Sequence, residues 1–420
     1  MANSNIVNNK KKIQDENKED SKVFYKEICI GDDWKEVECE YEFINSCAIE
    51  KGGDYLVFAN EGAEIPNYVK TIGPRAFSHG NIKEVVFPNS VEIIENNGCS
   101  NGYCLESVVL NEGLKKIGEL AFYDTKVKSI EIPSTVDDIA SGTFQDINIT
   151  VDPRNTKYEA RGNCLIEKET KKLINGTKDS IVPNDIKVID SAAFYRSEIE
   201  FIEIPSSVEV IEKHAFSCSN LREIKLNEGL KKIGKEAFRF TKIKKISIPN
   251  TVKEIEEVAF GKIKFIVDKR NEKYEARKNC LVDKDLNKIV LGGKSKKVSK
   301  DIKHIGDRAF ELSNIKSLRI PKSVERIGIL SFGACGKMRK LILNEGLKKI
   351  GKFAFMGLKI KSIIVPSTVD IMDDSAFAAC ERLKIIYCRA KSKPIGWNDN
   401  WNSKGLDGEY YDVVWGYKGK

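Results

Sequence analysis

The nine-residue stretch "LNEGLKKIG" occurs three times in the chain without a change, at residues 110–118, 226–234 and 343–351. Each copy lies inside a longer pattern, which reads "LREIKLNEGLKKIGKEAFRFTK" from Leu221 and carries an Ala-Phe pair as its most regular feature. A pattern that recurs in this way is typical of stacked repeats, in which each unit buries its apolar side chains against its neighbours. The nonapeptide therefore predicts a repeat architecture for most of the 420 residues.

The phenylalanines of the Ala-Phe pairs divide the chain into three blocks of four short repeats. Neighbouring anchors within a block are 22 or 23 residues apart, and Cys99 takes the Phe place in one degenerate copy. Two aligned insertions, near residues 151–180 and 267–297, lengthen the step between blocks to 50 residues and are predicted to form β-hairpins. A degenerate third copy of the insertion precedes the first block, so the large unit of about 116 residues occurs three times. The anchors are Phe77, Cys99, Phe122 and Phe144; Phe194, Phe216, Phe238 and Phe260; and Phe310, Phe332, Phe355 and Phe377.

Each short repeat alternates apolar and polar residues before its turn. Ile224 and Leu226 are predicted to face the core and Lys225 the opposite side, following the two-residue period of a half-buried strand. The turn is "NEG" in one version and Ile-Pro-x-x in the other, where the proline helps to end the strand. The next segment, "GKEAF", is predicted to form a short helical turn that carries Ala237 and Phe238 inward. Stacked repeats of this kind would share a parallel sheet and a column of phenylalanines.

The stretch "IPSSVEVIEKHAFSCSNLREI", residues 204–224, resembles the BspA-type leucine-rich repeat, whose consensus is close to IPxxVxxIGxxAFxxCxxLxxI. The resemblance covers roughly residues 45 to 395, and the C-terminal segment resembles the terminal element of clostridial-type members of this bacterial family. It implies an α/β leucine-rich-repeat solenoid. Such a solenoid is a right-handed superhelix with a parallel β-sheet on its concave side, and with short strands and helical turns on its convex side.

The chain outside the repeats is predicted to cap the stack, because an open solenoid exposes sheet edges and core at both ends. We expect a disordered polar tail at 1–21, a β-hairpin cap at 22–45, the solenoid at 46–389 and a tryptophan-rich cap at 390–420. A tryptophan-rich platform that stacks on a carbohydrate is the alternative interpretation of the C-terminal segment. The tryptophans outside the repeats are Trp34, Trp397, Trp401 and Trp415.

The composition indicates a mixed surface without a clustered basic stripe. Lys and Arg number 70 and Asp and Glu number 62, so the formal net charge is 70 − 62 = +8, with both signs interspersed. No nucleic-acid partner is predicted, since no reading motif is present either. The 11 cysteines contain no CxxC pair, which favours reduced, buried thiols. The N-terminal 20 residues lack the apolar core of a signal peptide or membrane span, so we expect a cytoplasmic protein, with export to the cell surface as the alternative.

No catalytic constellation is visible in the sequence, since it has no nucleophile with a base, no paired carboxylates and no phosphate-binding loop. The three histidines occupy variable polar positions in separate repeats, so a shared metal site is not predicted. Three cysteines near the ends of their repeats are predicted to be core residues rather than metal ligands. We therefore expect no enzymatic activity, no cofactor and no metal. The histidines are His79, His214 and His304, and the cysteines are Cys218, Cys335 and Cys380.

The residues between the two inward positions of each strand face outward, and with the curvature that the family implies they line the concave face. This row is charged or polar in its middle and apolar at both ends. Contiguous exposed apolar residues often mark contact sites, although β-branched residues also favour strands for structural reasons alone. The predicted partner-binding residues are Val86, Val109, Glu131, Glu203, Lys225, Arg319, Ile342, Ile364 and Tyr387, and Thr150, Ser247 and Ile266 complete the row.

These features predict a non-enzymatic scaffold that binds a protein ligand, or less readily a glycan, on its concave sheet. A sheet that the stack has already ordered loses little conformational entropy on binding. The alternatives are an exported adhesin or effector that binds host proteins, as surface-displayed relatives imply, and a glycan-binding protein that uses the tryptophan-rich tail. We expect a monomer without membrane insertion, and self-association through the end strands is a further possibility.

Overall fold

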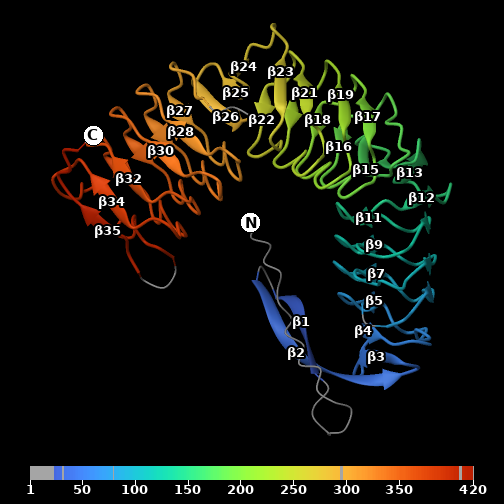
Figure 1. The fold of residues 1–420 in the computed structure, drawn as a ribbon. Coiled ribbons are helices and arrows are strands. Elements are labelled where there is room, and N and C mark those ends of the chain that lie inside the picture. The colour runs from blue at the N-terminus through green and yellow to red at the C-terminus, as the bar shows by residue number, and fades with distance from the viewer. Residues whose placement is uncertain (1–22, 31–32, 79, 294–296, 406–408, 420) are drawn as a thin grey trace.

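The computed structural model describes residues 23–30, 33–78, 80–293, 297–405 and 409–419. In Figure 1 the chain winds into coils that stack side by side along an arch. The strands β1 (Val23–Ile30) and β2 (Asp33–Ile44) pair antiparallel and extend away from the first coil, and β35 (Asp412–Val414) lies at the other end of the arch. The expected polar tail and the middle of the hairpin turn lie outside the described residues.

A typical coil carries two short strands. The first strands pair in parallel two by two, and the second strands pair in parallel through the whole block. In the second block, β17 (Phe201–Ile204) pairs with β19 (Glu223–Leu226), and every second residue of each strand is buried. The second strands have two residues each and pair through the whole block in one ladder. This ladder consists of β16 (Val188–Ile189), β18 (Val210–Ile211), β20 (Lys232–Ile233) and β22 (Glu254–Ile255).

The prediction of an α/β solenoid with helical turns is wrong, because the described residues contain no helix. The Ala-Phe segment instead uses alternate backbone amides to bond the next coil: Phe216 N donates to Ala237 O at 2.8 Å and Cys218 N to Arg239 O at 2.8 Å. His214 and Cys218 also adopt positive φ angles of 57° and 61°. Left-handed residues four positions apart stop an α-helix, so the described part of the molecule is a solenoid of strands and turns.

The left-handed turn is a property of every repeat and not of one sequence. In each of the twelve repeats, the residue two positions before the anchor has a positive φ, although it is a glycine in only one of them. This backbone strain is offset by the hydrogen bonds between coils, which the turn makes possible. The left-handed residues are Arg75, Asn97, Leu120, Gly142, Ala192, His214, Glu236, Val258, Arg308, Leu330, Phe353 and Ser375.

The anchor phenylalanines form a stacked column of four rings in the second and third blocks, and Phe122 stacks on Phe144 in the first. In the second block the centroids of successive rings are 4.8, 5.2 and 5.1 Å apart, and the ring planes are within 7° of parallel. The rings are buried together with the inward residues of both kinds of strand, so each block has its own continuous apolar core. Burial of this apolar surface drives the stacking of the coils.

A three-stranded antiparallel element begins each block and has a register shift at the equivalent residue every time. Its last strand pairs in parallel with the first two-residue strand of the block, and the element therefore starts the ladder. The three copies are β2–β3 (Cys47–Glu50)–β4 (Tyr55–Ala59), β13 (Tyr158–Arg161)–β14 (Cys164–Glu167)–β15 (Lys172–Gly176) and β24 (Tyr274–Arg277)–β25 (Cys280–Asp283)–β26 (Lys288–Gly292).

The nonapeptide is a turn whose polar residues bind the backbone of neighbouring coils. In the middle copy, Asn227 Nδ2 donates to Ile204 O of the preceding coil at 2.9 Å. Gly229, with a φ of 118°, donates its amide to Thr251 Oγ1 of the next coil at 3.1 Å. The Thr251 hydroxyl in turn donates to Leu230 O at 2.8 Å. Equivalent contacts recur at Asn111, Gly113 and Thr135 and at Asn344, Gly346 and Thr368.

The charged residues of the nonapeptide also have partners. Lys231 Nζ lies 2.7 Å from Glu209 of the preceding coil, and Glu228 lies 3.1 Å from Arg270, which belongs to the following insertion. The other two copies form the same kinds of ion pair. Because its Asn, Glu, Gly and Lys positions all have partners in other coils, the nonapeptide can hardly change without loss of a contact, and this explains its threefold identity.

A tyrosine closes the ladder at the end of the first and second blocks. Tyr274 is 4% exposed, and its hydroxyl oxygen accepts a hydrogen bond from Ile255 N, the last strand of the second ladder, at 3.0 Å. Tyr158 accepts from Ile139 N at the same distance in the first block. Asn271 holds Tyr274 in place, because its side-chain oxygen accepts the Tyr274 amide at 2.7 Å. The C-terminal edges of these two ladders are therefore hydrogen-bonded and not open.

Replacement of Tyr274 by Phe should lower the free energy of unfolding by about 1–3 kcal/mol, since the buried Ile255 amide loses its acceptor while the ring is kept. Urea denaturation measures the loss, and hydrogen exchange of the Ile255 amide should become faster. Tyr103→Phe is the matched control, because Tyr103 is 61% exposed and water replaces its hydrogen bond. Equal stability of the two variants would show that another group accepts the Ile255 amide.

Candidate interaction surface

The structure brings the predicted outward residues together in one row, which we name the outward row. Residues that are 19 to 23 positions apart in sequence become direct neighbours by strand pairing. Val86 of β6 (Glu84–Val86) lies opposite Val109 of β8 (Ser107–Val109). The other pairs in register are Glu131 with Thr150, Glu203 with Lys225, Ser247 with Ile266, Arg319 with Ile342, and Ile364 with Tyr387.

The accessibility of the outward row differs between its two ends. Val86 and Val109 are 68% and 52% exposed, so the first block presents two neighbouring apolar side chains to solvent. Ile342, Ile364 and Tyr387 at the other end are half-buried. The Tyr387 ring packs against the ring of Tyr417 from the C-terminal tail, with a centroid distance of 4.3 Å. The remaining members of the row are exposed, namely Glu131, Thr150, Glu203, Lys225, Ser247, Ile266 and Arg319.

In the middle of the outward row, the charges neutralise each other. Lys225 Nζ lies 2.5 Å from a carboxylate oxygen of Glu203, and this hydrogen bond lowers the pKa of Glu203. One position before the strands, Arg222 lies 3.0 Å from Glu200. Both pairs are solvent-exposed, so each contributes little to stability. The middle of the row is therefore close to neutral despite its many charged residues.

The third block carries a group of exposed cations that the sequence analysis missed, and we name it the basic face. It covers β28 (Ser317–Arg319), β30 (Lys340–Ile342), β32 (Ser362–Val365) and β34 (Ile385–Cys388). The cations lie a repeat length apart in sequence, with acids between them, so a search for charge runs does not find them. Comparison of the charges at one repeat position across the blocks would have found them. The basic face consists of Lys316, Arg319, Arg339, Lys340, Lys361 and Lys384.

The tryptophans of the C-terminal segment close the apolar core. Trp397 and Trp401 are 3% and 2% exposed, and Trp397 Nε1 donates to Val369 O at 3.0 Å. The ring of Trp401 contacts that of Phe377, the last anchor, with centroids 6.2 Å apart. Trp415 packs against the same cluster. The two buried rings present no free face on which a sugar could stack.

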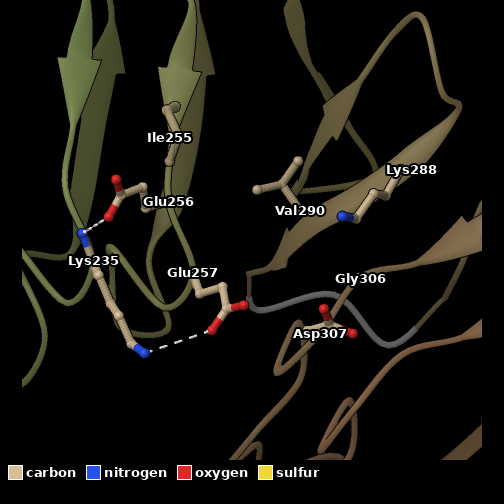
Figure 2. A pocket seen from close by; sticks show the side chains of 8 residues that line it. All are labelled: Lys235, Ile255, Glu256, Glu257, Lys288, Val290, Gly306 and Asp307. Atoms are coloured by element: carbon tan, nitrogen blue, oxygen red, sulfur yellow. Dashed lines mark hydrogen bonds and ion pairs between the residues drawn. The ribbon is translucent and has the colours of Figure 1, made fainter. Parts of the chain in front are cut away.

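A hollow of about 350 Å³ lies between the end of the second block and the first coil of the third (Figure 2). Its acids and bases pair with each other or with neighbouring groups: Lys235 lies 3.9 Å from Glu257, and Glu256 lies 2.6 Å from Lys232. The hydrogen bond from Lys232 lowers the pKa of Glu256. The hollow is lined by Lys235, Ile255, Glu256, Glu257, Lys288, Val290, Gly306 and Asp307. The geometry presents mixed charges without a nucleophile beside a base.

Most thiols of the described residues are buried, including Cys335 and Cys380 as predicted, whereas Cys218 is only half-buried. Burial raises the pKa of Cys164 to about 11 and that of Cys380 to about 12, so both thiols are protonated at neutral pH and are poor nucleophiles. His214 and His304 lie in different blocks, and burial lowers the pKa of each. His79 lies outside the described residues. Within the described ranges, no group of three or more His, Cys, Asp or Glu side chains could hold a metal ion.

The part of the chain that the structure describes contains no helix long and apolar enough to cross a bilayer. Comparison with known structures finds bacterial leucine-rich proteins of similar length. A leucine-rich cell surface protein from Faecalibacterium prausnitzii is 19% identical, with 90% of this chain and 95% of that chain covered and a TM-score of 0.42. The pneumococcal vaccine antigen PcpA is 18% identical, with 94% and 88% covered and a TM-score of 0.42. A leucine-rich repeat protein from Bacteroides ovatus is 17% identical, with 90% and 98% covered and a TM-score of 0.35.

At these identities and TM-scores, the neighbours carry no argument about the ligand of this chain. No curated protein matches the chain significantly. The sequence profile of the BspA type leucine rich repeat region, in contrast, matches in six copies at residues 59–150, 171–266 and 303–404, which is more than half of the chain. The matched segments coincide with the stacked coils of the three blocks. The chain therefore belongs to the BspA-type leucine-rich-repeat family.

Proposed function

We propose that this protein is a non-enzymatic scaffold that binds a protein partner through the outward row. The observation that supports the proposal most directly is the exposure of Val86 and Val109, which lie side by side on a parallel sheet. Neighbouring exposed apolar side chains are typical of contact sites. Within the described residues no group of three or more His, Cys, Asp or Glu side chains could hold a metal ion, and the buried tryptophan rings argue against a sugar platform in the tail.

Rigidity is the physical basis of the proposed function. The strands that carry the outward row are held by parallel pairing, by the phenylalanine columns and by the hydrogen bonds between successive Ala-Phe turns. Binding to such a surface orders few additional backbone dihedrals, so most of the contact free energy is kept as affinity. A partner that spans several coils would gain contact free energy from each coil that it touches.

The partner can be identified by photo-crosslinking from Ser247, an exposed member of the outward row, and then purified for binding measurements. Ile342→Glu combined with Ile364→Glu should weaken binding of this partner at least about tenfold, because two charges enter its apolar contact. The midpoint of thermal unfolding should fall by only a few degrees, as expected for about 1 kcal/mol at half-buried strand positions.

The matched control is Ile329→Glu combined with Ile371→Glu, since both isoleucines are exposed but neither lies in the outward row. This control should leave binding within about twofold of the wild-type value, within the spread of neutral surface substitutions. Equal weakening by both variants would contradict the assignment of the outward row. A large loss of stability in the first variant alone would show that Ile342 and Ile364 belong to the core.

An exported adhesin would use the outward row in the same way, so the location of the protein needs its own test. Protease treatment of intact producing cells distinguishes the two cases. Cleavage of the protein before lysis supports display at the cell surface, and protection until lysis supports a role inside the cell.

A further inference from the structure

The basic face contains a column of four cations that occupy the same position in four successive coils. Lys316, Arg339, Lys361 and Lys384 each precede the first strand of their coil and are exposed. Arg339 N donates to Lys316 O at 2.9 Å and Lys384 N to Lys361 O at 3.1 Å, so their backbones are direct neighbours. Within each of these two pairs the backbones lie about 4.8 Å apart, as in adjacent strands.

The cations of the basic face have no ion-pair partner among the described residues. The nearby acids of the same coils are engaged elsewhere: Glu325 pairs with Lys348, and Glu381 with Lys359. Asp412, the first residue of β35, lies opposite Ile385 at the end of the sheet. None of the outward positions of β28, β30, β32 and β34 is acidic. Like charges on neighbouring strands repel each other, and an anionic ligand would relieve this repulsion.

The equivalent positions of the other blocks do not form such a column. In the second block these positions hold Glu200, which lies 3.0 Å from Arg222, followed by Lys244 and the buried Ile263. In the first block the signs alternate between Lys83, Glu106 and Lys128. The three blocks share one scaffold, so this difference in charge is independent of the fold. Lys245 and Lys264 also lie opposite each other in the second block, but among the described residues only the third block carries a cation at the position of the column in four successive coils.

Beside the column lies the half-buried apolar end of the outward row, Ile342, Ile364 and Tyr387. An extended protein segment can present carboxylates on one side and apolar side chains on the other, because successive side chains alternate. A polysaccharide has no apolar side chains to cover Ile342, Ile364 and Tyr387. Bases of a single-stranded nucleic acid usually stack on a free aromatic face, and the Tyr387 ring packs against Tyr417.

We propose that the basic face, with the adjacent apolar end of the outward row, docks an acidic, extended segment of a protein partner. This inference rests on the proposed scaffold function and specifies the chemistry of the partner. The carboxylates would pair with the column, and apolar side chains of the same segment would cover Ile342 and Ile364. Binding through several exposed cations should weaken steeply as salt increases.

The probe is a fluorescent synthetic peptide of alternating Glu and Val residues, and its affinity is measured by anisotropy against the full-length chain. A Gln-Val peptide of the same length controls for the apolar side chains. Arg339→Glu with Lys361→Glu should weaken binding of the Glu-Val peptide at least about tenfold. Lys83→Glu with Lys128→Glu makes the same change of charge at equivalent positions of the first block and should change affinity less than about twofold.

The milder variant Arg339→Gln with Lys361→Gln should give a smaller loss in the same direction, and it serves as the test if the charge reversal prevents folding. An increase in salt from about 50 to about 300 mM should weaken binding to the wild-type protein several-fold. Equal loss in both double variants, or an affinity independent of salt, would overturn the inference. Tighter binding of heparin or of a short DNA duplex than of the Glu-Val peptide would also overturn it and would assign the face to another polyanion.

The crosslinked partner separates this inference from the scaffold function. If the purified partner binds the Arg339→Glu, Lys361→Glu variant as tightly as the wild type, the inference fails and the scaffold function stands. If no protein crosslinks to the outward row although the Glu-Val peptide binds as expected, the scaffold function fails. If the variant weakens binding of the partner and of the Glu-Val peptide alike, the result supports both the inference and the scaffold function.

Discussion

Phe238→Ala is expected to lower the free energy of unfolding by about 3–5 kcal/mol, the usual cost of truncating a buried phenylalanine. Phe238 is 1% exposed, and its ring stacks between those of Phe216 and Phe260, with centroids 5.2 and 5.1 Å away. The neighbouring rings are fixed by their own coils, so they cannot close the cavity. Both ring contacts are lost together with the buried apolar area.

Urea denaturation followed by circular dichroism measures this loss. Phe240→Ala is the matched control, because Phe240 lies two residues further along the same turn and is 60% exposed. Its truncation should change stability by less than about 1 kcal/mol, since little buried area is lost. If the two variants were equally stable, Phe238 would not support the column, and the description of the core would be wrong.

Gly229→Ala is expected to cost about 2–4 kcal/mol, because it combines backbone strain with a steric collision. Gly229 has a φ of 118°, which residues with a side chain rarely adopt. A Cβ atom there would collide with the carbonyl oxygen of Ser206 in the preceding coil. Relief of the collision would separate two coils that hydrogen bonds and apolar packing hold together.

Gly261→Ala is the control for this prediction, since a Cβ atom at Gly261 would have no other atom within 4 Å. Its effect on urea denaturation should stay within about 0.5 kcal/mol. The equivalent changes at Gly113 and Gly346 should resemble Gly229→Ala, as both glycines have positive φ and face a carbonyl oxygen of the preceding coil. A loss below about 1 kcal/mol at all three glycines would show that the coils separate easily, contrary to the structure.

Repeat spacing predicts which residues of this fold share a position, and it does not predict the backbone conformation between them. The inward direction of Ile224 and Phe238 follows from alternation and periodicity, because stacking buries the same position in every coil. The helical turn predicted for "GKEAF" is wrong for a physical reason. Hydrogen bonds to the next coil, such as that from Phe238 N to Ala259 O, compete with local helical bonds and prevail.

Part of the surface was predictable too, because strand alternation determines which side chains face outward. The outward position of Val86 and Lys225 follows from strand alternation, but the half-burial of Tyr387 depends on Tyr417, which belongs to a tail without repeats. The pairing of Glu203 with Lys225, and the lack of an ion-pair partner for Arg339 among the residues that the structure describes, depend on side-chain geometry between coils. Charge signs along one chain do not contain that information.

The closure of the first two ladders by Tyr158 and Tyr274 affects how the molecule would respond to stretching. Each ladder of two-residue strands ends at its own block, and at the seams the fourth coil is joined to the next block by side-chain contacts such as Ser141 Oγ to Asp190 at 2.9 Å. Side-chain contacts of this kind break more easily under load than a ladder of backbone hydrogen bonds between strands. A molecule stretched from its two ends would therefore yield first at its two seams, and an intact block could keep its part of the surface while its neighbour is pulled open.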